Sequence, residues 1–415
     1  MSLTASAARV AVLAAICSLG LFGGGCGDYF RPVANPEPLP GGDPQRSSHA
    51  VVVSNNGSDL GTAVIIDVTG DTNVGSFSGD SFGVGRDPVH ATSSGGIDYV
   101  VNFDDDNVAT FTVPTVGVPL NISKISLDPG GKPVFAAAAQ GKVFVAESGL
   151  GLVRDTSSTS LQAIPVGKTP VALVATPDGT QLFCLNQGDD TVSVIFPATD
   201  QNVSTISLAT GAKPVWGAVS ADGMRVYVVN QGSSTVSVIN TVGDLVTAPN
   251  NPLSVGDSPN YIYYEATLNR FYVTSPADNS LSIINNNVDP NQCASTPSLC
   301  VQKVSTAGPP CNGQHPISVT ALADGSRAYV ADDMTNSVCV LNTTTNTFTK
   351  SIPVGTAPVF IASNPDSTRV LTANSGSGDV SLIQTSDDTT VKQSDGVTPL
   401  TITTGGTPTF MAITP

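Results

Sequence analysis

The chain repeats one pattern of short β-prone segments, and this repeat constrains the fold more than any other feature of the sequence. The two clearest copies begin at Gly167 and Gly211. Each copy opens with Gly-x-x-Pro and an apolar run, turns at Asp-Gly, and continues into an aromatic segment that ends at Asn186 or Asn230. A polar loop, the segment Thr-Val-Ser-Val-Ile and a fourth segment follow. Because Asp-Gly between two β-prone runs favours a tight hairpin, each copy predicts four antiparallel strands.

Both ends of the pattern can be marked independently along the 415 residues, and each marker occurs eight times. The Gly-x-x-Pro motifs begin at Gly85, Gly130, Gly167, Gly211, Gly256, Gly313, Gly355 and Gly405. The aromatic segments end at Asn55, Asn102, Glu147, Asn186, Asn230, Ser275, Asp332 and Asn374, which we call the strand-end residues. The first copy begins near Ser47 without its first strand, and the last copy stops at Pro415 after that strand alone. We therefore predict that the C-terminal strand completes the first unit.

Four strands in roughly 40–45 residues is the period of a propeller blade. A lone blade cannot bury both faces of its sheet, and an open array leaves two end faces wet, so closure into a ring is favoured. Charged residues make up only 12% of the chain, which suits strands and turns better than amphipathic helices. The sequence predicts an all-β fold: a closed β-propeller of eight four-stranded blades in a single domain, residues 49–415. Seven blades is the alternative if the unit from Phe135 to Val166 does not form its own blade.

The first 26 residues predict an export signal. Arg9 precedes the apolar run from Val10 to Phe22, and three glycines then lead to Cys26. A basic start, a short apolar core and small residues before a processing point are typical of a signal peptide. The Gly-Gly-Gly-Cys end resembles a bacterial lipoprotein box, although Gly23 stands where that box usually has leucine. We expect lipid attachment at Cys26, with simple secretion as the alternative, and a semi-rigid tether over the Pro-rich residues 27–48.

Five cysteines follow this signal, so at least one thiol stays unpaired within the chain. Cys293 and Cys300 flank a short loop and are disulfide candidates in an oxidising compartment. Cys184 and Cys339 lie inside apolar segments, where a free cysteine usually acts as a small core residue. The pairing of Cys311 stays open. Because no Cys-x-x-Cys or Cys/His cluster with zinc spacing occurs, we expect no metal at these thiols.

The segments Tyr227–Asn230, Tyr272–Ser275 and Thr235–Ile239 resemble the YVTN-type β-propeller repeat of bacterial and archaeal envelope and surface-layer proteins (YncE-like). The resemblance covers residues 49–415 and implies a propeller located in the cell envelope. It does not imply one activity, because this fold hosts binders, scaffolds and enzymes. Relatives include sugar-lactone hydrolases and the propeller parts of redox enzymes, but no catalytic motif of either group matches residues here. We therefore expect no cofactor.

The second residue after each repeat proline is often aromatic, in a chain with 6% aromatic residues overall. These positions hold His90, Phe135, Ala172, Trp216, Tyr261, Ser318, Phe360 and Phe410. The first strand of each blade should lie beside the axial channel, so this register predicts a ring-lined channel mouth for a flat apolar, sugar or quinone-like ligand. Its candidate ligand-binding residues are His90, Phe135, Trp216, Tyr261, Phe360 and Phe410. The alternative is that these rings wedge between neighbouring blades.

The polar motifs favour structural roles. The three histidines, His49, His90 and His315, fall at different repeat positions, which argues against a metal triad. Carboxylates gather in the loop before the third strand, but without calcium-repeat spacing, and aspartate favours such turns for backbone reasons. We interpret these loops as solvated turns, and expect each strand-end asparagine to bond the turn backbone. The loops contain Asp104–Asp106, Asp189–Asp190 and Asp332–Asp333.

The formal net charge of −16 disfavours nucleic-acid binding, because an acidic surface repels phosphate backbones. The leading hypothesis is a non-enzymatic envelope scaffold that binds an unknown protein or small molecule, anchored to the membrane only by its N-terminal lipid. The long insertion from Asn285 to Gly313 is its candidate contact loop. An enzyme at the channel mouth is the alternative, with Glu265 and Arg86 as the charged residues of the first strands. A surface-layer or adhesion subunit is a third hypothesis.

Overall fold

The computed structural model describes residues 49–68, 81–113, 121–157, 160–243, 245–247, 252–293, 296–393 and 395–414. The chain divides into two units, Met1–Val33 and Ala34–Pro415, and every described residue belongs to the second. The regular secondary structure of the described residues is almost entirely antiparallel strand. Among the described residues, no helix combines the length and the hydropathy needed to cross a membrane.

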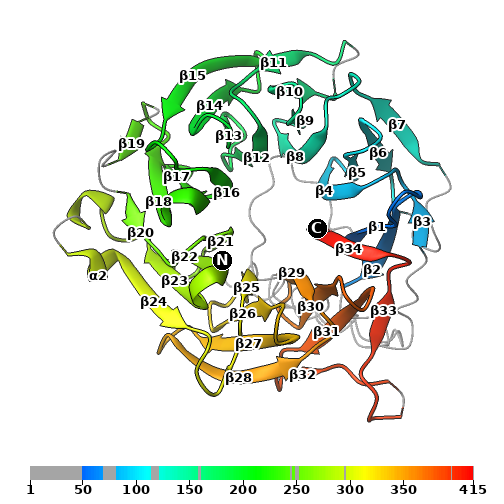
Figure 1. The fold of residues 1–415 in the computed structure, drawn as a ribbon, viewed down its shortest axis with the longest axis vertical. Helices are drawn as coiled ribbons and strands as arrows, with labels where there is room; N and C mark the ends of the chain where they lie inside the picture. Colours follow the sequence, from blue (N-terminus) through cyan, green and yellow to red (C-terminus); the bar gives the residue numbers. More distant parts are fainter. Residues whose placement is uncertain are drawn as a thin grey trace, which may run out of the picture. The chain divides into compact units, whose positions relative to one another are not determined.

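Eight antiparallel sheets stand side by side in a ring, each with one edge strand at the centre (Figure 1). From the centre outward, blades 1 to 4 contain β34 (Thr407–Thr414), β1 (His49–Asn55), β2 (Thr62–Asp67) and β3 (Ser81–Gly83); β4 (Pro88–Ser94), β5 (Ile97–Asn102), β6 (Asn107–Phe111) and β7 (Ser123–Ser126); β8 (Pro133–Ala139), β9 (Lys142–Glu147), β10 (Leu152–Asp155) and β11 (Ala163–Pro165); and β12 (Pro170–Ala175), β13 (Leu182–Asn186), β14 (Thr191–Phe196) and β15 (Gln201–Ser207).

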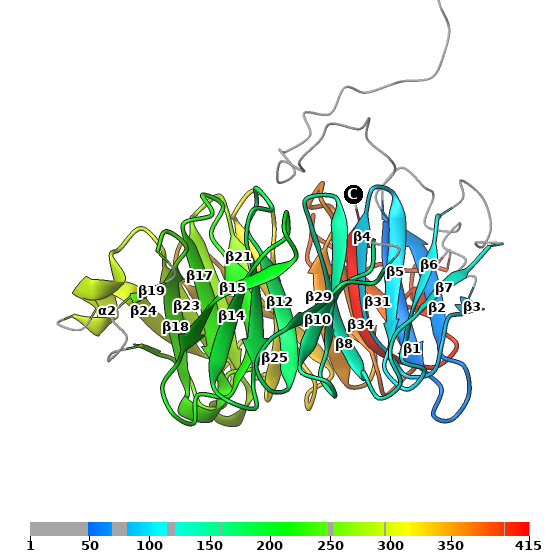
Figure 2. The same cartoon turned by 90° about the horizontal axis from the view of Figure 1, so that it is seen from above.

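The second half of the ring follows the same order. A view from the edge shows blades standing side by side, with their strands running between the two faces of the ring (Figure 2). Blades 5 to 8 contain β16 (Pro214–Val219), β17 (Arg225–Asn230), β18 (Thr235–Asn240), β19 (Leu245–Thr247) and β20 (Leu253–Ser254); β21 (Tyr261–Glu265), β22 (Arg270–Ser275), β23 (Ser280–Asn285) and β24 (Val301–Ser305); β25 (Pro316–Ala321), β26 (Arg327–Asp332), β27 (Ser337–Asn342) and β28 (Thr347–Pro353); and β29 (Pro358–Ser363), β30 (Arg369–Asn374), β31 (Asp379–Gln384), β32 (Thr389–Thr390) and β33 (Thr401–Thr403).

The C-terminal strand closes the ring, as predicted. β34 pairs with β1 from His49 opposite Thr414 to Asn55 opposite Thr407, so it supplies the inner strand that the first blade lacks. The described core consists of eight apolar clusters, each formed between two adjacent blades. An open row of eight blades has only seven such interfaces, so the eighth identifies a closed ring. β8 to β11 form a complete blade, and the seven-blade alternative is therefore wrong.

The repeat glycine is explained by close packing against the strand-end residue of the same blade. A Cβ on Gly167 would lie 2.6 Å from the Asn186 amide nitrogen, a separation that real Cβ atoms do not show. The Asn186 amide donates to the hydroxyls of Thr191 and Ser193, both at 3.0 Å, on the third strand. The expectation that strand-end asparagines bond the turn backbone holds for Asn55, which accepts the backbone amide of Gly57 at 2.7 Å, but not for Asn186. Asn186 joins two strands of a blade and leaves room only for glycine beside it.

The acidic loops also connect neighbouring blades. Asp104 and Asp189 are exposed, as expected of solvated turns, whereas Asp332 is buried. Asp190 adopts a left-handed backbone conformation with φ of 56°. Its carboxylate accepts hydrogen bonds from the backbone amides of Gly211 and Lys213 in the next blade, both at 2.7 Å. Asp106 accepts the amide of Lys132 in the following blade at 2.8 Å in the same way. Because carboxylate bonds to backbone N–H groups are charge-assisted, these contacts stabilise the junctions between blades.

Candidate functional site at the ring axis

The inner strands direct the side chain of the second residue after the proline by means of a β-bulge. In seven of them the pairing with the second strand shifts between the proline and the predicted register position, as from Pro214 to Trp216 in β16. Proline has no N–H to offer a ladder, which suits it to this irregular position. A bulge bends the strand and changes the direction of its side chains. The bulge therefore sets the direction of the register in these strands, whereas β21, which carries Tyr261, has no such shift.

The six ring-bearing residues of this register contact one another around the axis, and we call them the axial cluster. Neighbouring centroids are separated by 3.8 Å for His90 and Phe135, 4.3 Å for His90 and Phe410, and 4.5 Å for Phe360 and Phe410. Trp216 lies 5.2 Å from Phe135, 5.1 Å from Tyr261 and 6.4 Å from Phe410. The axial cluster consists of His90, Phe135, Trp216, Tyr261, Phe360 and Phe410.

Contacts between blades that are not neighbours place this cluster at the axis. Phe135 of blade 3 reaches Trp216 of blade 5 past Ala172, the small residue of blade 4. Trp216 also contacts Phe410 of blade 1, from the far side of the ring. A ring wedged only between two adjacent blades could not make these contacts. Five of the rings nevertheless also pack against the apolar clusters between adjacent blades, as the wedge alternative expects. The rings fill the centre of the propeller at this level.

The axial cluster is apolar in its chemistry. His90 is buried, and burial lowers its pKa to about 3, so the imidazole is neutral at pH 7. Its Nδ1 accepts the backbone amide of Ala136 at 3.4 Å. The other five rings are half-buried. His49 and His315 lie elsewhere, each beside an aspartate.

The two charged residues proposed for an active site make structural contacts. Glu265 is 3% exposed, and its carboxylate accepts the backbone amides of Thr267 and Leu268, both at 2.7 Å, in the turn after β21. Arg86 is exposed and pairs with Asp105, with 2.6 Å between Nε and Oδ1. Both charged groups are thus already paired near the ends of strands, Glu265 with backbone amides and Arg86 with Asp105.

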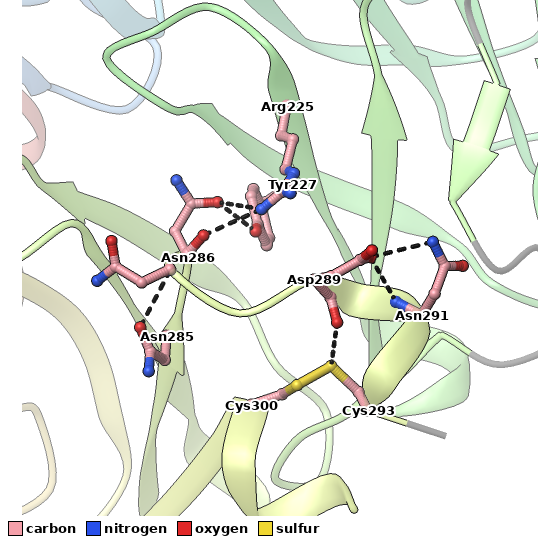
Figure 3. The surroundings of a disulfide bond; sticks show 9 residues. Arg225, Tyr227, Asn285, Asn286, Asp289, Asn291, Cys293 and Cys300 are labelled. Carbon is pink, nitrogen blue, oxygen red and sulfur yellow. Dashed lines mark hydrogen bonds between the residues drawn. A yellow bond between two sulfur atoms is a disulfide. The ribbon is translucent and has the colours of Figure 1, made fainter. Parts of the chain in front are cut away.

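The insertion after β23 is held by a disulfide and by the neighbouring blade (Figure 3). Cys293 and Cys300 are bonded to each other, and Cys300 ends the short helix α2 (Pro297–Cys300). At the start of the insertion, Asn286 accepts hydrogen bonds from Tyr227 Oη at 2.6 Å and from the Arg225 guanidinium. A shallow pocket beside α2 is lined by Arg270, Leu299, Cys300, Gln302 and Asn346, among others.

A second disulfide corrects the expectation for Cys339. That residue lies on β27 and is bonded to Cys311, which precedes β25 in the same insertion, rather than staying a free core thiol. The insertion folds back over the blade, which brings two cysteines 28 residues apart into contact. Cys184 is free and buried, and burial raises the pKa of its thiol. The predicted lipid site Cys26, the signal peptide and the tether all lie outside the described residues.

No family model and no curated protein matches the chain. Among solved structures it is similar to the dihydro-heme d1 dehydrogenase NirN in complex with DHE, with 16% identity, a TM-score of 0.65, and coverage of 88% of this chain and 75% of that one. Apo AztD from Citrobacter koseri gives 13% identity, a TM-score of 0.61, and coverage of 88% and 98%. Virginiamycin B lyase from Staphylococcus aureus gives 13%, 0.53, and coverage of 69% and 91%. Likeness at these identities shows the β-propeller fold alone.

Proposed function

We propose that this protein is a non-enzymatic binding scaffold of the cell envelope, exported and held to the membrane by a lipid on Cys26. The observation that carries the proposal is the axial cluster. Six rings in mutual contact fill the centre of the propeller, where a channel-mouth enzyme would need space and converging polar groups. The closed ring then serves as a rigid support, and the loops serve as its contact surface.

The insertion after β23 is the loop best prepared for contact with a partner. Its disulfide and the bonds of Asn286 fix it against the ring, which reduces the entropy that binding would otherwise cost. Leu299, at its outer edge, is 56% exposed, a large apolar side chain beside the polar pocket. A fixed loop with an exposed apolar residue and a polar surround has the composition of a protein-binding surface.

One observation favours a second candidate, a flat ligand stacked at the channel mouth. Five of the six rings keep part of their surface exposed, and aromatic faces stack on flat apolar or sugar rings. In that case the axial cluster is the floor of a binding site. Two of the similar solved structures are named as a dehydrogenase and a lyase, which is consistent with this second candidate.

Trp216 distinguishes the two, because it is the only tryptophan of the chain and belongs to the axial cluster. The full chain is titrated with menadione, a flat naphthoquinone, while tryptophan emission is followed and N-acetyltryptophanamide corrects for absorption. The scaffold proposal expects weak quenching that rises linearly with probe concentration. Saturable one-to-one quenching that disappears in Phe360→Ala, or hydrolysis of glucono-δ-lactone that depends on Glu265, would overturn it.

A further inference from the structure

In three blades the strand-end asparagine donates to a hydroxyl on the third strand of its own blade, seven residues later in the chain. The Asn186 amide donates to Ser193 at 3.0 Å, and the Asn230 amide donates to Ser237 at 2.8 Å. Asn374 repeats this arrangement with the hydroxyl of Ser381 at 2.9 Å. The donor on one strand and the acceptor on the next are thus matched within the blade.

Where the strand-end residue is acidic, the residue seven positions later changes with it. In blade 3 the strand-end residue is Glu147, fully buried, and the partner is Arg154, whose guanidinium bonds its carboxylate. In blade 7 the strand-end residue is Asp332, and the partner position holds Cys339. A buried carboxylate needs a cation or donors, and blade 3 supplies one. Blade 7 supplies a sulfur atom.

Asp332 is a buried carboxyl group without a hydrogen-bond partner. It is 0% exposed, and neither carboxyl oxygen has a donor among the described residues. Gly313 packs directly against the carboxyl group. Burying an unpaired carboxyl is costly, and such groups often mark functional sites.

We propose that Cys311, Cys339 and Asp332 form a redox-gated metal site, which is closed by the disulfide and binds a thiophilic divalent cation of the zinc class once the disulfide is reduced. The two sulfur atoms and a carboxylate oxygen all lie within 4.8 Å of one another. All three residues are buried. The orphaned carboxyl of Asp332 therefore points to a cation that the oxidised state does not admit.

The chemistry balances with a dithiol as reductant. The dithiol gives two electrons and two protons, its own sulfurs close into a disulfide, and the Cys311–Cys339 bond breaks to give two thiols. The metal then displaces the protons of both thiols, and that of Asp332, to solvent. Two thiolates and one carboxylate leave the fourth tetrahedral position to water. Thiolate ligands favour zinc over magnesium or calcium.

The position of Cys311 gives this site a route to solvent. It lies in the segment between β24 and β25, between the exposed residues Pro310 and Asn312, whereas Cys339 and Asp332 sit on interior strands of the blade. Breaking the disulfide removes the covalent bond that ties this segment to Cys339 on β27. Its displacement opens the path to the carboxyl group of Asp332.

Cobalt(II) is the probe, because tetrahedral thiolate coordination gives it visible d–d bands and a near-ultraviolet charge-transfer band. The full chain carrying Cys293→Ser and Cys300→Ser is reduced with dithiothreitol, desalted without oxygen and titrated with cobalt. We expect one tightly bound cobalt per chain with thiolate bands, and none in the oxidised protein. Adding Cys311→Ser should abolish the charge-transfer band, and Asp332→Asn should weaken binding by more than about tenfold.

Circular dichroism accompanies each titration so that unfolding is recognised. A reduced, folded chain without thiolate bands, or bands that persist in Cys311→Ser, would overturn the proposal. If reduction unfolds the chain, cobalt must restore the β-sheet signal, since metal binding then drives folding. Failure to restore it would overturn the proposal too. The site uses no residue of the axial cluster, although Cys311 belongs to the insertion proposed as the contact loop. The cobalt titration needs no binding partner, so its failure and the failure of the scaffold proposal are read separately.

Discussion

Asp332→Asn is expected to raise the free energy of unfolding of the oxidised, metal-free protein at pH 8 by several kcal/mol. The folded-state pKa of Asp332 is about 8, against an ordinary value of 3.8, so between these values the folded state holds a proton that the unfolded state releases. Stability therefore falls as pH rises through this window, by about 1.4 kcal/mol per unit at most. Asparagine does not titrate, and the same residue already occupies this position in other blades, at Asn186 and Asn230.

Urea unfolding of wild type and variant at several pH values measures this gain. It should shrink as the pH falls and become independent of pH below about 4, where aspartate is protonated in both states. Asp59→Asn, at an exposed position, is the matched control and should show no comparable pH-dependent gain. An equal effect of Asp332→Asn at pH 4 and pH 8 would mean that the carboxyl does not carry the burial cost assigned to it.

Arg154→Ala is expected to destabilise the protein by about 3–5 kcal/mol, because it leaves the carboxylate of Glu147 buried without its charge partner. Glu147 is 0% exposed and Arg154 is 5% exposed. Burial raises the pKa of Glu147, against the opposing effect of the guanidinium. Arg154 also binds Asp128 at 2.8 Å and the carbonyl of Leu161 at 3.0 Å, so its loss removes a small network.

The double variant Glu147→Asn with Arg154→Ser separates the unpaired charge from the loss of packing. It installs the pair that Asn186 and Ser193 form in the next blade, which needs no charge. Most of the stability lost in Arg154→Ala should return, as judged by urea unfolding with unchanged m-values. A double variant as unstable as Arg154→Ala would show that blade 3 cannot accept the neutral pair.

The architecture could be predicted because its signals are local. Within a blade most paired strands follow one another in the chain, so the Asp-Gly turns and apolar runs specify the pairing. The exceptions are β20, which pairs with β18, and β33, which pairs with β31. The single non-local pairing, β34 with β1, was also predictable, because the two incomplete copies at the chain ends complement each other. The unit from Phe135 forms a full blade although its outer strands are short, since Arg154 and Glu147 replace the usual polar pair there.

The chemistry of the site was less predictable, because it depends on side-chain direction and on long insertions. The register of the aromatic residues was visible, but the bulge after proline, which turns Trp216 toward the axis, has no marker of its own. Cys339 resembled a core residue because its partner, Cys311, lies in an insertion whose return path no repeat specifies. Asp332 resembled the first residue of an acidic turn. Its alignment with the strand-end asparagines was the available signal that it faces the interior.

Collisional quenching of Trp216 by acrylamide tests the central claim, a ring axis filled by the axial cluster, most directly. Phe410 contacts His90, Phe360 and Trp216 from the closing strand, so Phe410→Ala removes three ring contacts, one of them with Trp216 itself. We predict weak quenching in the wild type and a several-fold steeper dependence on acrylamide in Phe410→Ala. Phe196→Ala, an exposed ring outside the cluster, should leave the dependence unchanged. Equal quenching in folded wild type and Phe410→Ala would contradict a filled axis.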